Sequence, residues 1–247
     1  MRLFQVLLVA ALCLPSASLW AKDHIIILAG QSNMMGRGKT FELPAAYKKT
    51  PANVQFFYQG RERKLAQFAY FGPEVSFAHE VARAFPNDNI ILVKQAASGS
   101  RIKQWQPGQS LYQGLLRQVG FATDDKQDAP IDAILWMQGE SDAQSNLHIA
   151  SQYGGQLRQL ANSLRTDLQS PHSLFIFGQT SLDHPASQAS LDAVRQQQQA
   201  MQQALANSSM ITTDGLGKMG DGIHLNAAGQ IELGRRFAKT YLDQTRQ

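Results

Sequence analysis

The residues His24-Ile25-Ile26-Ile27-Leu28, followed directly by Ala29-Gly30-Gln31-Ser32-Asn33-Met34, decide the expected fold of this chain. The first five form a continuous apolar run with three successive isoleucines, which is typical of a strand buried on both faces of a parallel sheet. A glycine and polar residues follow where the strand should end. Because ligands bind beyond the carboxyl ends of strands in open parallel sheets, we expect Ser32 to lie at a functional site.

Apolar runs of this kind alternate with helical patterns along the chain. Further strands are expected at residues 89–93, 131–137, 174–177 and, more weakly, 210–213, and helices at residues 74–85, 111–121, 149–168, 191–205 and 227–242. Asn226 is the expected N-cap of the last helix. This alternation predicts an α/β fold, a three-layer αβα sandwich with about five parallel strands. Residues 37–72 have weak periodicity, so we interpret them as a long connection of the kind that often binds ligands.

The first 21 residues are typical of a secretory signal peptide. Met1-Arg2 is a positive start, residues 3–14 are an apolar run, and small residues precede Ala21, after which we expect cleavage. Residues 22–247 would then form a single domain, exported to the periplasm or the medium of a bacterium. Cys13 is the only cysteine, so this domain would have neither a disulfide nor a thiol nucleophile. No later apolar run is long enough to insert stably into a membrane.

Composition and missing motifs exclude several function classes. The formal net charge is +4 at pH 7, and loss of Arg2 with the signal peptide would lower it by one. The basic residues are mostly scattered, without the charged stripe and aromatic platforms of nucleic-acid binding, so we expect no nucleic-acid partner. The sequence lacks Gly-x-Ser-x-Gly, His-Glu-x-x-His and a phosphate-binding loop, which argues against the common α/β-hydrolase elbow and the usual zinc-protease and nucleotide sites.

One of the six histidines has a carboxylate close to it in sequence. His224 follows Asp221 by three residues, and Gly222 between them permits a sharp turn in which the carboxylate accepts the imidazole Nδ1–H. Nε2 would then be able to take a proton from a nucleophile such as Ser32. The alternative is structural: a turn residue at Ser32, and a turn followed by a helix cap at residues 221–226. We expect the other five histidines to be surface or core residues.

Acyl transfer also needs hydrogen-bond donors for a developing oxyanion. The candidates are the backbone N–H groups of Ser32 and Gly99 and the side-chain amide of Gln138, which ends the third predicted strand. A tight turn at Gly99 and a strand-end cap at Gln138 are the structural alternatives. Glu140 has three open roles: to hold Gln138, to orient His224, or to bind a substrate hydroxyl.

Three blocks together resemble a known family. Residues 30–34 (Gly-Gln-Ser-Asn-Met), 136–142 (Trp-Met-Gln-Gly-Glu-Ser-Asp) and 221–225 (Asp-Gly-Ile-His-Leu) are similar to the signature blocks of the SGNH-type hydrolases. They are most similar to the branch of sialate O-acetylesterases and carbohydrate esterase family 6. The family pattern usually has two glycines where this chain has Ser98-Gly99. A backbone N–H survives that change, so we expect activity to be retained with a different fit of the acyl pocket.

The resemblance implies a flavodoxin-like sheet and a serine esterase that deacetylates carbohydrates through an acetyl-serine intermediate, without metal or cofactor. It implies Ser32 as nucleophile, His224 as base, and Gly99 and Gln138 as oxyanion donors, which the backbone N–H of Ser32 would join. The supporting acid would be Asp221, with Glu140 as a rival. The acetylated sugar and the oligomeric state stay open.

Three alternative functions remain at this stage. One is a general carboxylesterase or lipase-like SGNH hydrolase. The second is a metal-dependent phosphoesterase that uses Asp221, His224, Glu140 and Asp142. The third is a non-catalytic sugar-binding protein with a stacking surface of aromatic side chains. The candidates for that surface are Trp105, Tyr58, Phe56, Phe57 and Tyr70.

Overall fold

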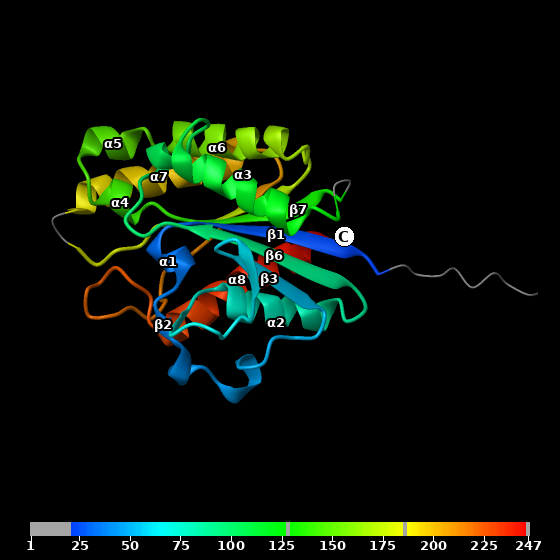
Figure 1. Cartoon of the computed structure of the whole chain (residues 1–247). Helices are drawn as coiled ribbons and strands as arrows, with labels where there is room; N and C mark the ends of the chain where they lie inside the picture. Colours follow the sequence, from blue (N-terminus) through cyan, green and yellow to red (C-terminus); the bar gives the residue numbers. More distant parts are fainter. Residues whose placement is uncertain (1–20, 127–128, 185–186, 246–247) are drawn as a thin grey trace, which may run out of the picture.

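A computed structural model describes residues 21–126, 129–184 and 187–245, so the predicted signal peptide lies outside the described residues except for Ala21. A seven-stranded sheet runs through the centre of the molecule (Figure 1). Its strands, in spatial order, are β4 (Arg61–Arg63), β3 (Val54–Tyr58), β6 (Asn89–Ala96), β1 (Asp23–Gly30), β7 (Ile131–Met137), β8 (Leu174–Gly178) and β9 (Ser208–Ile211). All neighbouring pairs are parallel except β3 and β4. The predicted α/β fold is confirmed.

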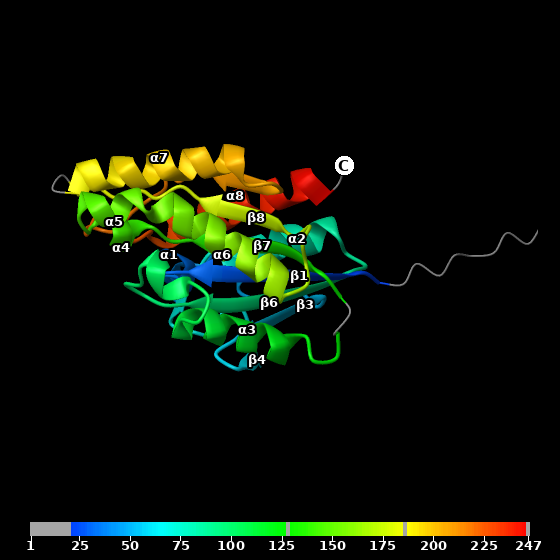
Figure 2. The ribbon, with the colours of Figure 1, turned by 90° about the horizontal axis from the view of Figure 1, so that it is seen from above.

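Helices cover both faces of this sheet. α2 (Glu74–Ala84) and α8 (Ala227–Thr245) lie on one face, and α3 (Ser110–Ala122), α6 (Tyr153–Asp167) and α7 (Gln188–Ala204) lie on the other (Figures 1 and 2). The predicted helix at residues 149–168 is divided at Gln152, with α5 (Leu147–Ser151) before it. Asn226 caps α8 as expected, because its Oδ1 accepts the Gly229 N–H at 2.9 Å.

The region at residues 37–72 contains more structure than the predicted connection. It forms β3 and β4, a two-stranded sheet of β2 (Gly38–Lys39) and β5 (Tyr70–Phe71), and two short 3₁₀ turns, η1 (Thr40–Glu42) and η2 (Ala45–Tyr47). The sheet therefore has six parallel strands rather than about five. β3 alternates buried and half-buried residues because it lies near the sheet edge, so it lacks the continuous apolar run of the central strands.

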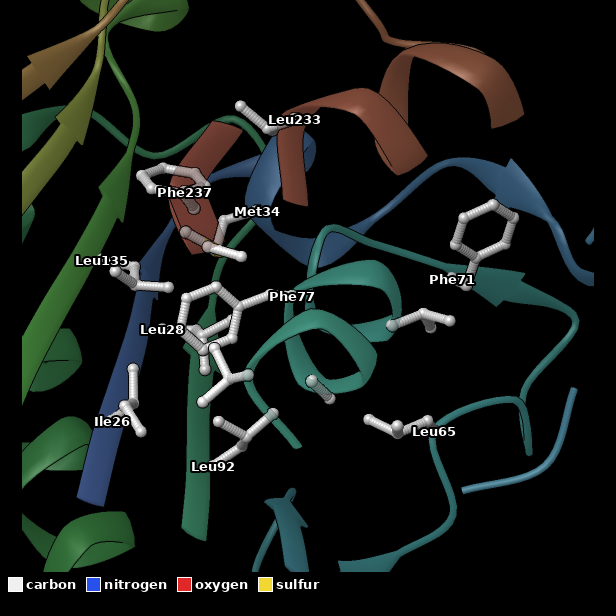
Figure 3. Packing of buried hydrophobic residues seen from close by; sticks show 14 of the residues in the cluster. Ile26, Leu28, Met34, Leu65, Phe71, Phe77, Leu92, Leu135, Leu233 and Phe237 are labelled. Carbon is white, nitrogen blue, oxygen red and sulfur yellow. The ribbon is translucent and has the colours of Figure 1, made fainter. Parts of the chain in front are cut away.

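Alternate residues of β1 face two separate apolar cores. Ile26 and Leu28 pack with Phe77 of α2 and Phe237 of α8, as Figure 3 shows, and all four are fully buried. Ile25 and Ile27 belong to the core beneath the helices of the other face. Each such side chain stabilises the fold by about 1.5–3 kcal/mol. Burial of both faces explains why the strand is apolar without interruption.

A tight turn follows β1 at the carboxyl edge of the sheet. Gly30 has a φ of +151°, and a Cβ at this position would lie 2.0 Å from the Met137 carbonyl oxygen, so only glycine fits. The turn is tied to both neighbouring strands: Gln31 N donates to Met137 O at 3.0 Å, and Ala97 N donates to Gly30 O at 3.0 Å. The residues after β1, β6 and β7 therefore meet at one place.

Both ends of the described chain lie at the opposite, amino edge of the sheet (Figures 1 and 2). His24 at the start of β1 contacts Tyr241 near the end of α8, with 2.9 Å between His24 Nδ1 and Tyr241 Oη. The same ring lies 2.7 Å from an Asp132 oxygen and 3.1 Å from an Asp88 oxygen. Within the described part of the chain, none of the helices combines the length and apolar character needed to cross a bilayer.

Candidate active site

Ser32 opens α1 (Ser32–Met35), the single helical turn that follows β1. The residue is only 2 % exposed, and its side chain makes no hydrogen bond to a described residue. The N–H groups at the beginning of a helix have no partner within it. The Ser32 hydroxyl therefore lies beside unpaired backbone donors at the carboxyl edge of the sheet, where the sequence predicted a site.

His224 and Asp221 form the contact that their spacing predicts. One Asp221 oxygen lies 2.7 Å from His224 Nδ1, and the other accepts the backbone N–H groups of Ile223 and His224, each at 2.9 Å. Burial by itself would raise the pKa of Asp221, but the hydrogen bonds from His224 and Ile223 outweigh it and lower the pKa to about 2. The carboxylate is therefore charged at neutral pH, fixes Nδ1–H toward itself, and leaves Nε2 as the acceptor nitrogen.

Asn33 joins the Ser32 turn to the His224 segment. Its Oδ1 accepts the Leu225 N–H at 2.9 Å, and its Nδ2 donates to the Ile223 carbonyl at 3.1 Å. These two backbone groups flank His224. Asn33 is 1 % exposed, so its hydrogen bonds are shielded from water. The residue next to Ser32 thus holds both neighbours of His224, although no direct hydrogen bond joins Ser32 to His224.

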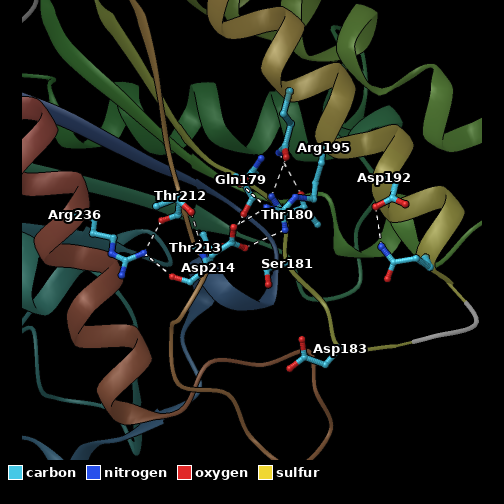
Figure 4. Close-up of polar contacts among 12 residues, drawn as sticks. Gln179, Thr180, Ser181, Asp183, Asp192, Arg195, Thr212, Thr213, Asp214 and Arg236 are labelled. Atoms are coloured by element: carbon cyan, nitrogen blue, oxygen red, sulfur yellow. Dashed lines mark hydrogen bonds and ion pairs between the residues drawn. The ribbon is translucent and has the colours of Figure 1, made fainter.

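The segment that carries His224 is also anchored to the loop after β8. Gly222 O accepts the Asp183 N–H at 2.8 Å, and Lys218 Nζ donates to Asp183 at 2.7 Å. Farther back, Arg195 of α7 forms a two-pronged ion pair with Asp214 at 3.0 and 2.8 Å (Figure 4). A long loop between β9 and α8 is therefore held at several points, which limits the movement of His224.

Glu140 begins α4 (Glu140–Ala143) and is fully buried. Its Oε1 accepts a hydrogen bond from Asn33 Nδ2 at 2.5 Å, while its Oε2 has no partner among the described residues. Burial raises the pKa of this carboxyl, and the Asn33 hydrogen bond and the charge of His224 only partly oppose the rise. Of the three roles left open for Glu140, these contacts agree best with orienting His224, and the effect is indirect. Glu140 contacts Asn33, which holds the His224 segment, whereas Asp221 contacts the imidazole itself.

The three oxyanion-hole candidates differ in whether their N–H groups already have hydrogen-bond acceptors. Gly99 is exposed in a turn after β6, with a φ of +72°, and its N–H has no acceptor in the described part of the chain. Gln138 Nε2 already faces three acceptors: Ser100 O at 2.9 Å, Asp142 Oδ2 at 2.6 Å and Gln31 Oε1 at 3.1 Å. An amide nitrogen carries two hydrogens, so both are engaged. Ser32 and Gly99 offer unpaired donors, whereas Gln138 must exchange a partner to donate.

The alternative sites find little geometric support. Among residues 21–126, 129–184 and 187–245, no group of three or more His, Cys, Asp or Glu side chains is arranged to hold a metal ion. The stacking surface of the sugar-binding alternative is also divided, because Trp105 and Phe56 are core residues at 0 % and 1 % exposure. Tyr58 and Tyr70 do line a common pocket.

Sequence reasoning left the contributions of Asn33, Gln31 and Asp142 unresolved. Asn33 and Gln31 stand in the first block that the resemblance rests on, but neither received a role. Asp142 was considered only as a ligand of the metal-dependent alternative, and the structure shows that it accepts hydrogen bonds from Gln138 Nε2 at 2.6 Å and from Ile102 N at 3.0 Å. All three act through partners more than 35 positions away or on another strand end. For Gln31 and Asn33, the position beside Ser32 in the first block was the only available signal.

Several known proteins are similar to this chain in sequence or in fold. A probable carbohydrate esterase of Arabidopsis thaliana, At4g34215, is 29 % identical over 244 residues, which cover 89 % of this chain and 90 % of the relative. Its crystal structure superposes with a TM-score of 0.78, covering 90 % of this chain and 98 % of that one. NanS is 15 % identical with a TM-score of 0.73, covering 91 % and 98 % of the two chains, and so shows the shared fold.

The carbohydrate acetylesterase XAC1771 of Xanthomonas citri shares the fold as well. It is 17 % identical with a TM-score of 0.68, over 89 % of this chain and 56 % of that one. The profile of the family described as "Carbohydrate esterase, sialic acid-specific acetylesterase" matches residues 22–243, nearly the whole described chain. The chain therefore belongs to the family of carbohydrate esterases known as sialic acid-specific acetylesterases.

Proposed function

We propose that this protein is an exported serine esterase that removes acetyl groups from carbohydrates through an acetyl-serine intermediate. The observation that carries the proposal is the His224–Asp221 pair, held against the Ser32 turn by Asn33. A nucleophile, a base and an orienting carboxylate are the three parts of a serine-hydrolase triad. Family membership supplies the ester of a carbohydrate as the substrate class.

In the proposed mechanism, Ser32 Oγ attacks the acetyl carbonyl carbon while His224 Nε2 takes the hydroxyl proton. Asp221 holds the imidazole by Nδ1 and stabilises the imidazolium that forms. The tetrahedral intermediate collapses, the sugar oxygen leaves with the proton from His224, and an acetyl group remains on Ser32. Water, deprotonated by His224, then attacks the acetyl-serine and releases acetate and the free hydroxyl of Ser32.

The oxyanion would be stabilised first by the N–H groups of Ser32 and Gly99, which have no acceptor within the described residues. Gln138 is the third proposed donor. Its hydrogen bond to Gln31 is the longest of the three that it makes, at 3.1 Å, and is the one that an oxyanion would replace at least cost. Asp142 would keep the Gln138 side chain in place during that exchange.

The test is acetate release from a panel of O-acetylated glycans by the purified domain. Ser32→Ala and His224→Ala should each lower kcat by roughly three to six orders of magnitude. The exposed residues Ser110 and His172 provide matched controls, and Ser110→Ala and His172→Ala should keep the wild-type rate. Near wild-type turnover by Ser32→Ala would end the proposal. Export is tested separately, by N-terminal sequencing of protein from the periplasm and medium for a chain that starts at Lys22.

A further inference from the structure

Residues 97–100 form the tight turn after β6 that carries Gly99, one of the proposed oxyanion donors. Gly99 is the third residue of this turn and has a φ of +72°, which is typical of a type II turn. Type I and type II turns differ in the orientation of the central peptide, which here contains the Gly99 N–H. The direction of this donor therefore depends on which conformation the turn keeps.

The described surroundings of Gly99 do little to fix that conformation. Gly99 is exposed, and a Cβ at this position would meet no described atom within 4 Å. The backbone bond that closes the turn, from Ser100 N to Ala97 O, is 3.3 Å long. That length lies beyond the usual range of an N–H···O bond, about 2.7–3.2 Å. A further contact is needed to hold the turn closed.

The Ser100 hydroxyl supplies this contact. Its Oγ donates to the same Ala97 carbonyl at 2.8 Å and accepts the indole N–H of Trp105 at 2.9 Å. Because an indole nitrogen only donates, the hydroxyl directs its single hydrogen at Ala97. Ser100 and Trp105 are 4 % and 0 % exposed, so both bonds are shielded from water. The hydroxyl is therefore a fixed closing contact of the turn.

Trp105 is itself held in one orientation. It ends the short 3₁₀ helix η3 (Ile102–Trp105), and its ring packs edge to face against Trp136 of β7, with 5.3 Å between the centroids. At the other end of η3, Ile102 N donates to Asp142 Oδ2 at 3.0 Å. The group that donates to the Ser100 hydroxyl thus belongs to the packed core rather than to a loose loop.

Ser100 also contacts the second candidate donor. Its carbonyl accepts Gln138 Nε2 at 2.9 Å, and an Asp142 oxygen lies 2.6 Å from the same nitrogen. When an oxyanion replaces Gln31 as a partner of this amide, Ser100 and Asp142 remain to hold it. Ser100 is therefore bonded to the turn of Gly99 through its side chain and to Gln138 through its backbone.

We propose that Ser100 is a positioning residue of the esterase, whose hydroxyl keeps the Gly99 N–H and the Gln138 amide directed at one oxyanion. The inference rests on the proposed function and adds to it a residue that acts through these two donors. Ser100 itself contacts no reacting atom. Loss of its hydroxyl should weaken the stabilisation of the tetrahedral intermediate and affect substrate binding much less.

The first test is Ser100→Ala, which removes one oxygen atom. With 4-nitrophenyl acetate and with an acetylated glycan, kcat should fall about tenfold to a hundredfold, because the donors are misplaced by about 1 Å. KM should change by less than about threefold, since the lost interaction belongs to the transition state. A wild-type kcat in Ser100→Ala would overturn the proposal.

Ser170 provides a matched control at the opposite edge of the sheet. It is 3 % exposed, and its hydroxyl likewise accepts one N–H, from Ile131 at 2.9 Å, and donates to one carbonyl, of Leu168 at 3.0 Å. Ser170→Ala should therefore lose a similar amount of stability in urea unfolding but keep the wild-type kcat. An equal fall of kcat in both variants would show a merely structural effect and would overturn the proposal.

The second test probes the oxyanion site without turnover. Methylboronic acid accepts an electron pair from Ser32 Oγ while the hydroxyl proton passes to His224, and a tetrahedral boronate anion forms. Its inhibition constant should rise in Ser100→Ala by the factor by which kcat/KM falls, about tenfold or more, and stay unchanged in Ser170→Ala. An unchanged inhibition constant in Ser100→Ala would count against the proposed role.

The outcomes separate this inference from the function on which it rests. The pH profile of kcat/KM should keep its shape in Ser100→Ala, because His224 is untouched; a shifted profile would assign the loss to the Asp221–His224 pair instead. Ser32-dependent hydrolysis that Ser100→Ala leaves at the wild-type rate would refute the positioning role and support the esterase. Failure to hydrolyse 4-nitrophenyl acetate or any acetylated glycan in a Ser32-dependent way would refute the esterase itself.

Discussion

Asn33 Oδ1 accepts the backbone N–H of Leu225 at 2.9 Å, although the two residues are 192 positions apart in the chain. The same side chain donates to Ile223 O and to Glu140, so one amide contacts both flanks of His224 and a fully buried carboxyl. The distance between the proposed nucleophile and its base therefore depends on a residue that takes no part in the chemistry.

Replacement of Asn33 tests this dependence. Asn33→Ala should lower kcat by about tenfold to a hundredfold, with a smaller change in KM, because a displacement of about 1 Å at the reacting groups has effects of that size. It should also lower the free energy of unfolding by about 1–3 kcal/mol, since buried partners lose hydrogen bonds. Asn162→Ala, at an exposed position of α6, is the control. An unchanged kcat in folded Asn33→Ala would show that other contacts position His224.

Glu140→Gln should change stability with pH in a defined direction. Burial raises the pKa of Glu140 above its ordinary value of 4.5, so the folded state holds the proton more tightly than the unfolded state. Ionisation therefore costs wild-type stability as pH rises above 4.5, and the variant does not incur that cost. Urea unfolding should find Glu140→Gln at least as stable as wild type at pH 7, with the difference shrinking as pH falls toward 4.5 and absent below it. A variant that is much less stable at pH 7 would contradict this reading of Glu140.

For Asp221, we expect stability to depend on pH in the opposite direction. Its pKa is lowered from 3.8 to about 2, so its carboxylate adds stability above pH 3.8 that is lost as pH falls toward 2. The stability difference between wild type and Asp221→Asn should be constant from pH 7 to pH 4 and then decrease. The group is 44 % exposed, so the effect on stability is small.

The effect of Asp221→Asn on activity should be much larger. An amide can hold the imidazole in the wrong tautomer, and we expect kcat to fall about a hundredfold or more. Asp192→Asn, on the exposed side of α7, should leave kcat unchanged. A normal rate for Asp221→Asn would return Glu140 to consideration as the supporting acid.

The buried ion pair between Lys94 of β6 and Glu74 of α2, with 2.7 Å between Nζ and Oε2, provides a stability test. Lys94→Met leaves the Glu74 carboxylate buried without its ion-pair partner and should destabilise the protein by about 3–5 kcal/mol. The double variant Lys94→Met/Glu74→Gln should recover much of that loss, because no unpaired charge remains. Urea unfolding measures both, with Lys103→Met at an exposed site as the control. A double variant as unstable as the single one would contradict the account of the pair.

The architecture could be predicted from sequence where burial is complete on both faces. β1, β6, β7 and β8 carry continuous apolar runs, and the structure confirms each of them. β3 and β4 were missed for a physical reason. β3 alternates in burial, and β4 consists of Arg61-Glu62-Arg63, a charged edge strand whose composition matches a solvated loop.

The contacts of the candidate site likewise include some that could be predicted from sequence and some that could not. The Asp221–His224 contact could be predicted because the two residues are only three positions apart, and Gly222 between them permits a local turn. The roles of Asn33 and Glu140 could not, since their partners lie on other strand ends and no periodic pattern links them. Local spacing indicates pairs that meet within one turn, whereas contacts between distant segments depend on the register of the whole sheet.

The contact between His24 and Tyr241 brings the first and last described elements together on the side of the sheet remote from Ser32. A fusion partner, a surface tether or a second module attached at either end would emerge from that side. Large glycans could then still approach the edge of the sheet that carries Ser32 without obstruction. The domain is thus suited to immobilisation on a support, or to insertion between other modules, with the Ser32 edge facing outward.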